Sequence, residues 1–265
     1  TAILNHEFRI NEKSVLRSGL AYHYSMYSNS ALNFYNATDP RPDYYRNMPS
    51  YQTESEAASW ISYLWKSDVN TRQINWDELY RSNMINRNVA FSDTARYSLE
   101  RRHNNLEELM FNSTFVSQVN NNLKLTAGIQ AKKSKGIHYK TMEDLMGGSE
   151  WVDIDQFAER DFREGSIIQN DLNNPNRIIK KGDKFGYDYD INVTHASAFL
   201  QNEWVLPQFD VYYAANLSYT NFYRYTRMKN GRDPRAQDGT WTEKGKVWYT
   251  MNPLVKAGFT YKIDG

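Results

Sequence analysis

Long runs of alternating apolar and polar residues are the clearest signal in this chain. After the polar turn at 120–122, the apolar residues Leu123, Leu125, Ala127, Ile129 and Ala131 occupy every second position. Period-two alternation indicates a β-strand whose two faces meet different environments. The run is longer than most strands of globular proteins. Because a tilted strand of about 9–11 residues can cross a bilayer, the pattern predicts part of a transmembrane β-barrel.

Seven such runs predict an all-β fold, an antiparallel up-and-down meander in which neighbouring strands pair. The predicted strands are 2–10, 15–27, 104–118, 123–139, 185–204, 209–228 and 249–263. In the run at 185–204, His195 and Ser197 interrupt the face that carries Phe185 and Tyr189, which predicts a β-bulge or a switch of face.

The same alternation predicts which side chains face lipid and which face a lumen. One sheet face is expected to carry the lipid-facing Leu123, Leu125, Ile129, Leu217, Tyr219, Val255 and Phe259. The opposite, lumen-facing side is expected to carry Lys124, Gln130, Ser218, Lys256 and Lys262.

The connections between the runs alternate in length. Those at 11–14, 119–122 and 206–208 are two to four residues long, whereas 28–94, 140–184 and 229–248 are long. Outer-membrane barrels have this layout, with the long loops outside the cell. Short helices are expected in the first long loop, one capped by Thr53 and one at 75–80. A secreted β-sandwich with binding loops at one end approximates the layout, but its strands would be shorter.

Composition narrows the function classes further. With 32 Lys and Arg against 31 Asp and Glu, the net charge of +1 gives no reason to expect a nucleic-acid partner. Cysteine is absent, which excludes disulfides and thiolate metal sites within this chain. The aromatic content of 15% fits the girdles of a membrane barrel. Because the chain opens inside an alternating run, we interpret residues 1–265 as a single partial barrel segment cut from a longer protein.

The polar residues predict neither an enzyme nor a metal or cofactor site. Asp153 and Asp155 could offer oxygens to Ca²⁺, but the ligand spacing of an EF-hand is not met, and a solvated loop is favoured. The histidines are scattered singly, and no two carboxylates stand out as a glycosidase pair.

Aromatic residues in the long loops are the candidates for ligand binding, since aromatic faces give much contact area at low entropic cost. These candidates are Tyr44, Tyr45, Trp60, Trp65, Trp76, Trp151 and Trp241. The alternative is that they hold the loops together as a compact cap.

Several segments resemble TonB-dependent outer-membrane receptors, of the type with large extracellular loops and a carboxypeptidase-regulatory-like N-terminal domain. The segments that carry this resemblance are Asp39–Tyr45, Gln73–Tyr80, Asp153–Phe162, Ile168–Leu172, Lys184–Asp190 and Asn252–Asp264. They are distributed over nearly the whole chain and are specific to the barrel and its loops, and they carry no information on the ligand.

The resemblance implies that this chain supplies about seven strands of a 22-stranded barrel in the outer membrane of a Gram-negative bacterium. In that family a plug domain fills the barrel, and an inner-membrane energy-coupling complex pulls the plug to release a bound nutrient. Outer-membrane lipid, the plug and the coupling complex are thus the implied partners; no plug or coupling segment occurs in this chain. A capping surface lipoprotein is left open, as is the choice of saccharide, peptide or metal chelate as ligand.

Two other functions compete with an energised receptor. One is a passive porin-like or adhesin-like outer-membrane barrel whose loops bind a partner. The other is a secreted soluble β-protein that acts on glycans.

Overall fold

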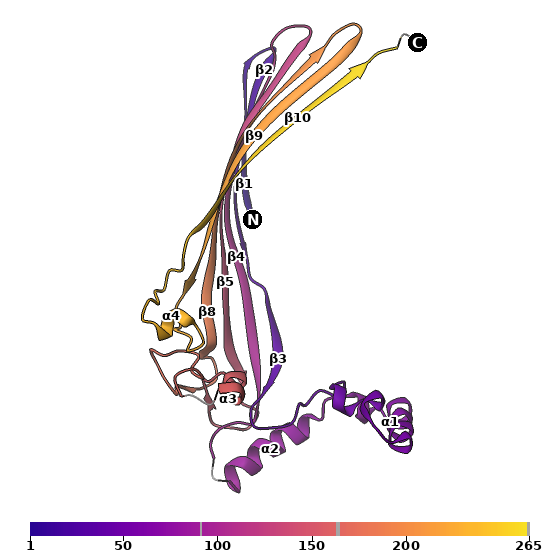
Figure 1. Cartoon of the computed structure of the whole chain (residues 1–265), viewed down its shortest axis with the longest axis vertical. Coiled ribbons are helices and arrows are strands. Elements are labelled where there is room, and N and C mark those ends of the chain that lie inside the picture. Colours follow the sequence, from indigo (N-terminus) through magenta and orange to yellow (C-terminus); the bar gives the residue numbers. More distant parts are fainter. Residues whose placement is uncertain (91, 163–164, 264–265) are drawn as a thin grey trace.

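The protein is one tall, twisted antiparallel sheet with its helices and long loops gathered at one end (Figure 1). The structure, a computed structural model, describes residues 1–90, 92–162 and 165–263. Strands make up 52% of the chain and helices 18%, which confirms the all-β class and the antiparallel meander. Within the described residues the sheet is open: it does not close into a barrel.

The strand order follows the chain, with each strand antiparallel to its neighbours. The strands of this sheet are β1 (Ala2–Asn11), β2 (Ser14–Ser25), β3 (Ser28–Phe34), β4 (Tyr97–Gln118), β5 (Leu123–Asp144), β8 (Lys184–Val205), β9 (Phe209–Thr226) and β10 (Trp248–Tyr261). The sheet order is β1-β2-β4-β5-β8-β9-β10, with β3 also paired to β4. As predicted, the first and last strands are therefore open edges of the described sheet, and β3, which pairs only with β4, is a further open edge on the side of β1.

Residues 28–34 were expected in a loop, and that prediction is wrong. β2 and β3 lie along the same edge of β4, so β3 extends the sheet toward the loops. For the same reason β4 begins at Tyr97 instead of residue 104, and β5 continues to Asp144. Charged residues on both faces of these strand ends hide the alternation in the sequence. In the structure many of them pair with each other, as Arg101 does with Glu143 at 2.6 Å.

Strand register divides the side chains between two faces, because directly opposed residues point to the same side. One face, here called the apolar face, carries Leu4, Phe8, Leu16, Leu20, Phe111, Phe115, Leu125, Ile129, Ala198, Leu200, Leu217, Tyr219, Val255 and Phe259. The other, the polar face, carries Lys124, Gln130, Ser197, Ser218, Asn252 and Lys256. Lys262 follows β10, and its ammonium lies 2.7 Å from Asp210 on the polar face. The predicted division into two faces is confirmed.

The predicted irregularity at His195 and Ser197 is wrong. Both residues pair in unbroken register with β5 and β9. The bulge lies nearer the loops, where Tyr139 pairs with Asp188 but Lys140 pairs with Phe185. Gly186 in this bulge has a φ of +73°, which glycine adopts without steric cost. The prediction failed because β8 has aromatic and β-branched residues on its polar face. The polarity of its residues alone therefore does not show which of them belong to the polar face.

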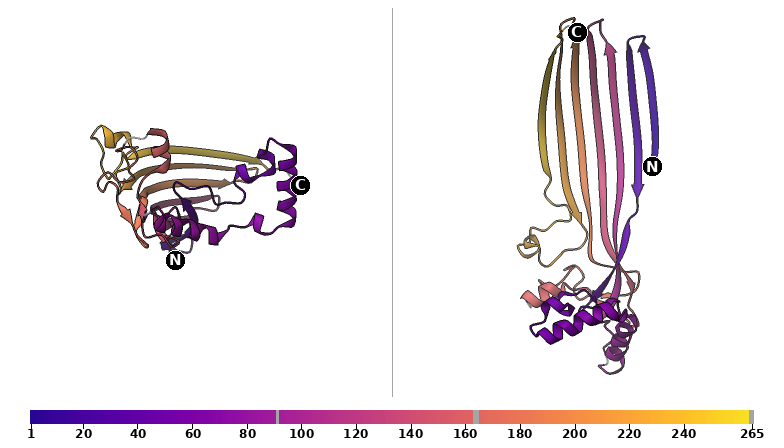
Figure 2. Two further views of the ribbon diagram at one scale, coloured as in Figure 1. Left: turned by 90° about the horizontal axis from the view of Figure 1, so that it is seen from below. Right: turned by 90° about the vertical axis from the view of Figure 1, so that its right-hand side faces the viewer.

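The long connections contain the helices, and these lie at one end of the sheet while the short turns lie at the other (Figure 2). The helices are α1 (Ser55–Ser67), α2 (Trp76–Asn88), α3 (Gln156–Phe162) and α4 (Pro234–Gln237), with single 3-10 turns η1 (Tyr45–Asn47), η2 (Pro49–Tyr51) and η3 (Asn70–Arg72). A small second sheet pairs β6 (Trp151–Val152) with β7 (Ile178–Ile179).

The two predicted helices exist, but their starts and lengths differ from the predictions. The N-cap of α1 is Glu54, not Thr53, and it makes no side-chain capping bond. α2 runs to Asn88 instead of ending at residue 80, and Asn75 caps it by accepting a hydrogen bond from the backbone N–H of Glu78. Asn75 fits its role because a short amide side chain can satisfy an unpaired N–H of the first turn.

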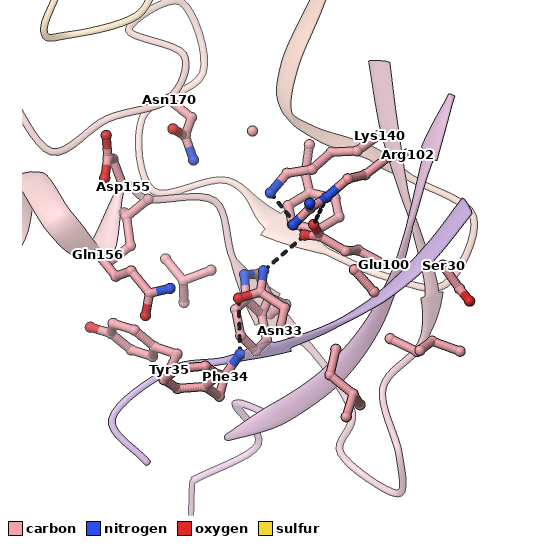
Figure 3. A pocket seen from close by; sticks show the side chains of 18 of the residues that line it. Ser30, Asn33, Phe34, Tyr35, Glu100, Arg102, Lys140, Asp155, Gln156 and Asn170 are labelled. Carbon is pink, nitrogen blue, oxygen red and sulfur yellow. Dashed lines mark hydrogen bonds and ion pairs between the residues drawn. The ribbon is translucent and has the colours of Figure 1, made fainter. Parts of the chain in front are cut away.

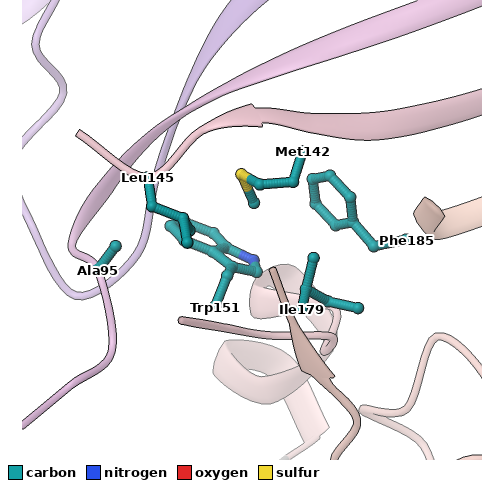
Figure 4. Packing of buried hydrophobic residues seen from close by; sticks show 6 residues of the cluster. All are labelled: Ala95, Met142, Leu145, Trp151, Ile179 and Phe185. Carbon is teal, nitrogen blue, oxygen red and sulfur yellow. The ribbon is translucent and has the colours of Figure 1, made fainter. Parts of the chain in front are cut away.

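The buried apolar residues lie at the loop end, not along the tall sheet. One cluster consists of Ala95, Met142, Leu145, Trp151, Ile179 and Phe185 (Figure 4), and a second of Leu79, Tyr97 and Met146. Asn83 of α2 is 1% exposed and connects this helix to the start of β4 and to the residues that follow β5. Its amide donates to the carbonyls of Tyr97, Leu145 and Met146. The loop end is therefore packed like the interior of a soluble domain.

We expect Ile179→Ala to loosen the loop end and Ile178→Ala to leave it intact. Ile179 is fully buried in the first cluster, whereas its neighbour Ile178 is 43% exposed. Truncating a buried isoleucine to alanine costs about 2–5 kcal/mol. Protease cleavage within residues 145–183, followed in increasing urea on the detergent-solubilised protein, measures the effect. Equal protection of the two variants would contradict this account of the core.

Candidate ligand-binding site

A cavity of about 940 Å³ opens on the polar face where the sheet meets the loops. Its walls come from β3, the loop-proximal ends of β4, β5 and β8, and the segment that leads into α3 (Figure 3). Small-molecule sites are usually concave spaces of about 300–1,000 Å³ with few, well-placed polar groups. The cavity has the size and position of a ligand site.

Glu100 is the centre of the polar wall. Its side chain is 2% exposed and binds two cations, Arg102 Nε at 2.6 Å and Lys140 Nζ at 3.0 Å. The amide of Asn33 donates to the same carboxylate at 3.0 Å, as the dashed lines in Figure 3 show. This placement follows from register, because Arg102 and Lys140 pair directly and Glu100 lies on the same face, two residues along β4. With two cations on one carboxylate, this wall has a net positive charge.

Aromatic and amide side chains form the opposite wall. Tyr35 packs edge-on against Trp151, with ring centroids 6.2 Å apart. Its hydroxyl donates to Glu159 Oε1 at 3.0 Å. Burial, with the help of this carboxylate, raises the pKa of Tyr35, which keeps the hydroxyl protonated. Gln156 lies beside Tyr35, and Asn170 lies farther along the cavity, near Asp155 (Figure 3). Rings and amides in one wall can contact both the apolar and the hydrogen-bonding parts of a ligand.

A second cavity of about 430 Å³ continues the first toward α4. The two share lining residues, among them Asp155, Asn170 and Tyr187. Arg232 reaches across from the last long connection to Asp155 at 3.1 Å. Arg235 lies 2.6 Å from Asp233, and this guanidinium holds the pKa of Asp233 below its usual value. The combined site therefore joins parts of all three long connections.

Of the seven aromatic candidates, the structure brings two to the cavity. Trp76 and Trp151 line it. Trp76 is 48% exposed, whereas Trp151 is 5% exposed and belongs to the buried cluster.

The remaining five candidates lie away from the main cavity. Tyr44 and Tyr45 pack edge-on with ring centroids 4.7 Å apart. Trp60 stacks on Tyr63 and, with Trp65, belongs to α1, the helix that lies farthest from the sheet (Figure 1). Trp241 packs under Lys229, near the second cavity. Whether any of the seven binds a ligand stays a prediction.

The acid-rich loop uses its carboxylates for structure. Asp153, expected in a solvated loop, is 2% exposed. It accepts hydrogen bonds from Arg177 at 2.6 Å, Asn170 at 2.9 Å and the N–H of Gly186 at 2.8 Å. In the part of the chain that the structure describes, no group of three or more acidic or histidine side chains could hold a metal ion.

The sequence reading missed the charged wall of Glu100, Arg102 and Lys140. Its signal was the cluster of charges on both faces near the start of β4, which obscured the strand there.

Comparison with protein-family models, with curated proteins and with solved structures finds no match to this chain. None of the described helices is long and apolar enough to cross a membrane.

Proposed function

We propose that this chain is part of the barrel wall of an energised outer-membrane receptor that takes up a nutrient. The observation that carries the proposal is the continuous apolar face, which extends over all seven neighbouring strands opposite a mainly polar one. The finer architecture we propose is seven strands of a 22-stranded transmembrane barrel, with lipid on the apolar face and the lumen on the polar face.

The dimensions of the apolar face support a membrane environment. From Phe209 to Tyr219, the apolar residues of β9 cover eleven positions, about 33 Å along the strand at 3.3 Å per residue and about 25 Å of height at a strand tilt of about 40°. The lipid-facing band of outer-membrane barrels is about 25 Å tall. Large side chains on this face have little cover in the isolated sheet: Val255 is 80% exposed and Phe259 66%. Water is an unfavourable solvent for such a surface, at about 25 cal/mol per Å².

The unpaired edges of β1 and β10 support the proposal that further strands complete the sheet. β1 and β10 each have one neighbour in the sheet, so half of their backbone groups lack a strand partner there. In lipid each unsatisfied backbone group costs several kcal/mol, and only closed sheets avoid this cost. Further strands, from the same protein in our proposal, would complete the ring.

The loop-end cavity supplies the receptor function in this proposal. It opens on the polar face, where a ligand entering from the loop side would reach the lumen. The partners we propose are a plug domain against the polar face, the inner-membrane coupling complex acting through that plug, and outer-membrane lipid. A surface lipoprotein over the loops is compatible with the same arrangement.

Single cysteines introduced on the two faces test the orientation, because this chain contains none. Leu217→Cys in the complete protein should react with a lipid-soluble maleimide and resist a charged one. Ser218→Cys, one residue along on the polar face, should react with the charged reagent. Reaction of both cysteines with the charged reagent in intact membranes would exclude the lipid-facing assignment.

Energy dependence separates the receptor from a passive barrel. We expect a gene-deletion strain to lose growth on one limiting nutrient and to regain it with the intact gene. Uptake of that nutrient should stop when the proton-motive force is dissipated. Uptake that continues at the same rate would favour the porin-like alternative.

We expect Trp76→Ala to weaken uptake and Trp60→Ala to leave it near wild type. Both tryptophans are exposed, at 48% and 59%, but of the two only Trp76 lines the cavity. Loss of an aromatic contact worth about 1–2 kcal/mol raises the half-saturating concentration by about tenfold. Uptake measured over a range of nutrient concentrations, in cells with matched receptor levels, gives the half-saturating concentration of each variant. Equal curves for the two variants would remove Trp76 from the binding site.

A further inference from the structure

On the apolar face, the apolar residues end toward the loops at a belt of charged residues and tyrosines. One register row is Leu20, Phe111, Ala131, Ala196, Tyr219 and Met251, and it is uncharged. The next row toward the loops is Tyr22, Leu109, Lys133, Thr194 and Asn221, and the one after it is Tyr24, Glu107, Lys135, Asn192 and Tyr223. The apolar face therefore gives way to lysines and tyrosines within two rows.

These rows enclose a cavity of about 570 Å³, separate from the ligand site because it lies on the other face of the sheet. Three cations line it, Lys133, Lys135 and Arg227, against the carboxylates Glu107 and Asp190. Tyrosines of β2 and β9 stand on its two sides. Its lining comes from five neighbouring strands, so it is a hollow across the sheet and not a gap at an edge.

The carboxylates in this cavity are already bound by protein groups. Asp190 has a side chain only 3% exposed and pairs with Lys135 at 3.3 Å and Arg227 at 2.6 Å. Glu107 accepts the hydroxyl of Tyr22 at 3.1 Å. Lys133 is exposed and forms no ion pair within the described part of the chain. The cavity thus holds three cations against two carboxylates, and Lys133 is the one of the three without an ion pair among the described residues.

We propose that this cavity binds the phosphate of a lipid headgroup at the upper boundary of the apolar face. The inference rests on the proposed membrane orientation. A lipid whose acyl chains cover Phe111 and Tyr219 places its headgroup at the level of Lys133. Basic residues at that depth attract anionic headgroups, and tyrosines are favoured at the same interface. Lys133 is the main contact, with Lys135 and the tyrosine hydroxyls beside it.

Native mass spectrometry of the complete protein in detergent tests the proposal, with lipid A carrying two phosphates as the probe. We expect Lys133→Glu to lower the fraction of protein with bound lipid at least fivefold, and Lys133→Arg to retain it. Lys256→Glu is the matched control, because it makes the same charge change at an exposed lysine on the polar face. Lipid A stripped of its phosphates should bind as weakly to the wild type as the intact lipid does to Lys133→Glu.

Three outcomes would overturn the inference. They are unchanged binding by Lys133→Glu, equal binding of phosphate-free lipid A, and full displacement of the lipid by millimolar inorganic phosphate, which would indicate a site for a free anion. If the apolar face does not meet lipid, a separate experiment detects this, because Leu217→Cys would then react with the charged maleimide.

Discussion

Replacing Leu217 with arginine should remove most of the assembled protein from the outer membrane, whereas Ser218→Arg should leave it near the wild-type level. Leu217 lies on the apolar face opposite Ala198 and Pro253, and it is 49% exposed. An arginine in the middle of a lipid-facing band costs about 2–4 kcal/mol, and far less on a lumen-facing side. Quantifying folded protein in outer-membrane fractions at equal expression measures the difference.

The paired design makes this result specific. Both substitutions add the same side chain at adjacent positions of one strand, so differences in expression or in strand propensity cancel. Equal losses would mean that both faces meet the same solvent, and the division into lipid and lumen would have to be abandoned.

The second large effect concerns the 265-residue chain by itself in water. We expect it to aggregate into β-rich material, because β1 and β10 present unpaired edges and the apolar face has no lipid to cover it. Expression without detergent, followed by size-exclusion chromatography and circular dichroism, is the measurement. Added detergent should reduce the aggregation.

A sharp monomer peak near 31.1 kDa with a cooperative thermal transition would contradict this expectation. It would favour a secreted soluble β-protein, in which the residues of the apolar face are tolerated in water. The loop-end clusters would then be the core of that protein.

The tall part of the sheet could be predicted because its two faces differ strongly. Over residues 123–131 of β5, 215–220 of β9 and 255–261 of β10, apolar residues alternate with polar residues or glycine without interruption, and a period of two fixes both the strand and its faces. The short turns could be predicted for the same reason, since they separate two such runs.

The loop end could not be predicted in the same way, because long-range pairing decides its structure. β3 forms against the charged start of β4, and neither segment alternates on its own. The wall around Glu100 depends on a register between β4 and β5 that periodicity does not encode. The helix starts differ for a local reason: Glu54 has the N-cap position although its side chain makes no capping bond, while Thr53 lies one residue outside.

The segregation of connections also limits how the length of this sequence can vary during evolution. An insertion of one residue within β5 would turn every following side chain of that strand to the opposite face, which would exchange residues between the apolar face and the polar face. The same insertion in the connections at 35–96, 145–183 or 227–247 leaves strand register untouched. Relatives of this protein should therefore keep strand lengths nearly constant and differ in length at the loop end. Residues at the loop end can therefore change without altering the pairing of the tall sheet.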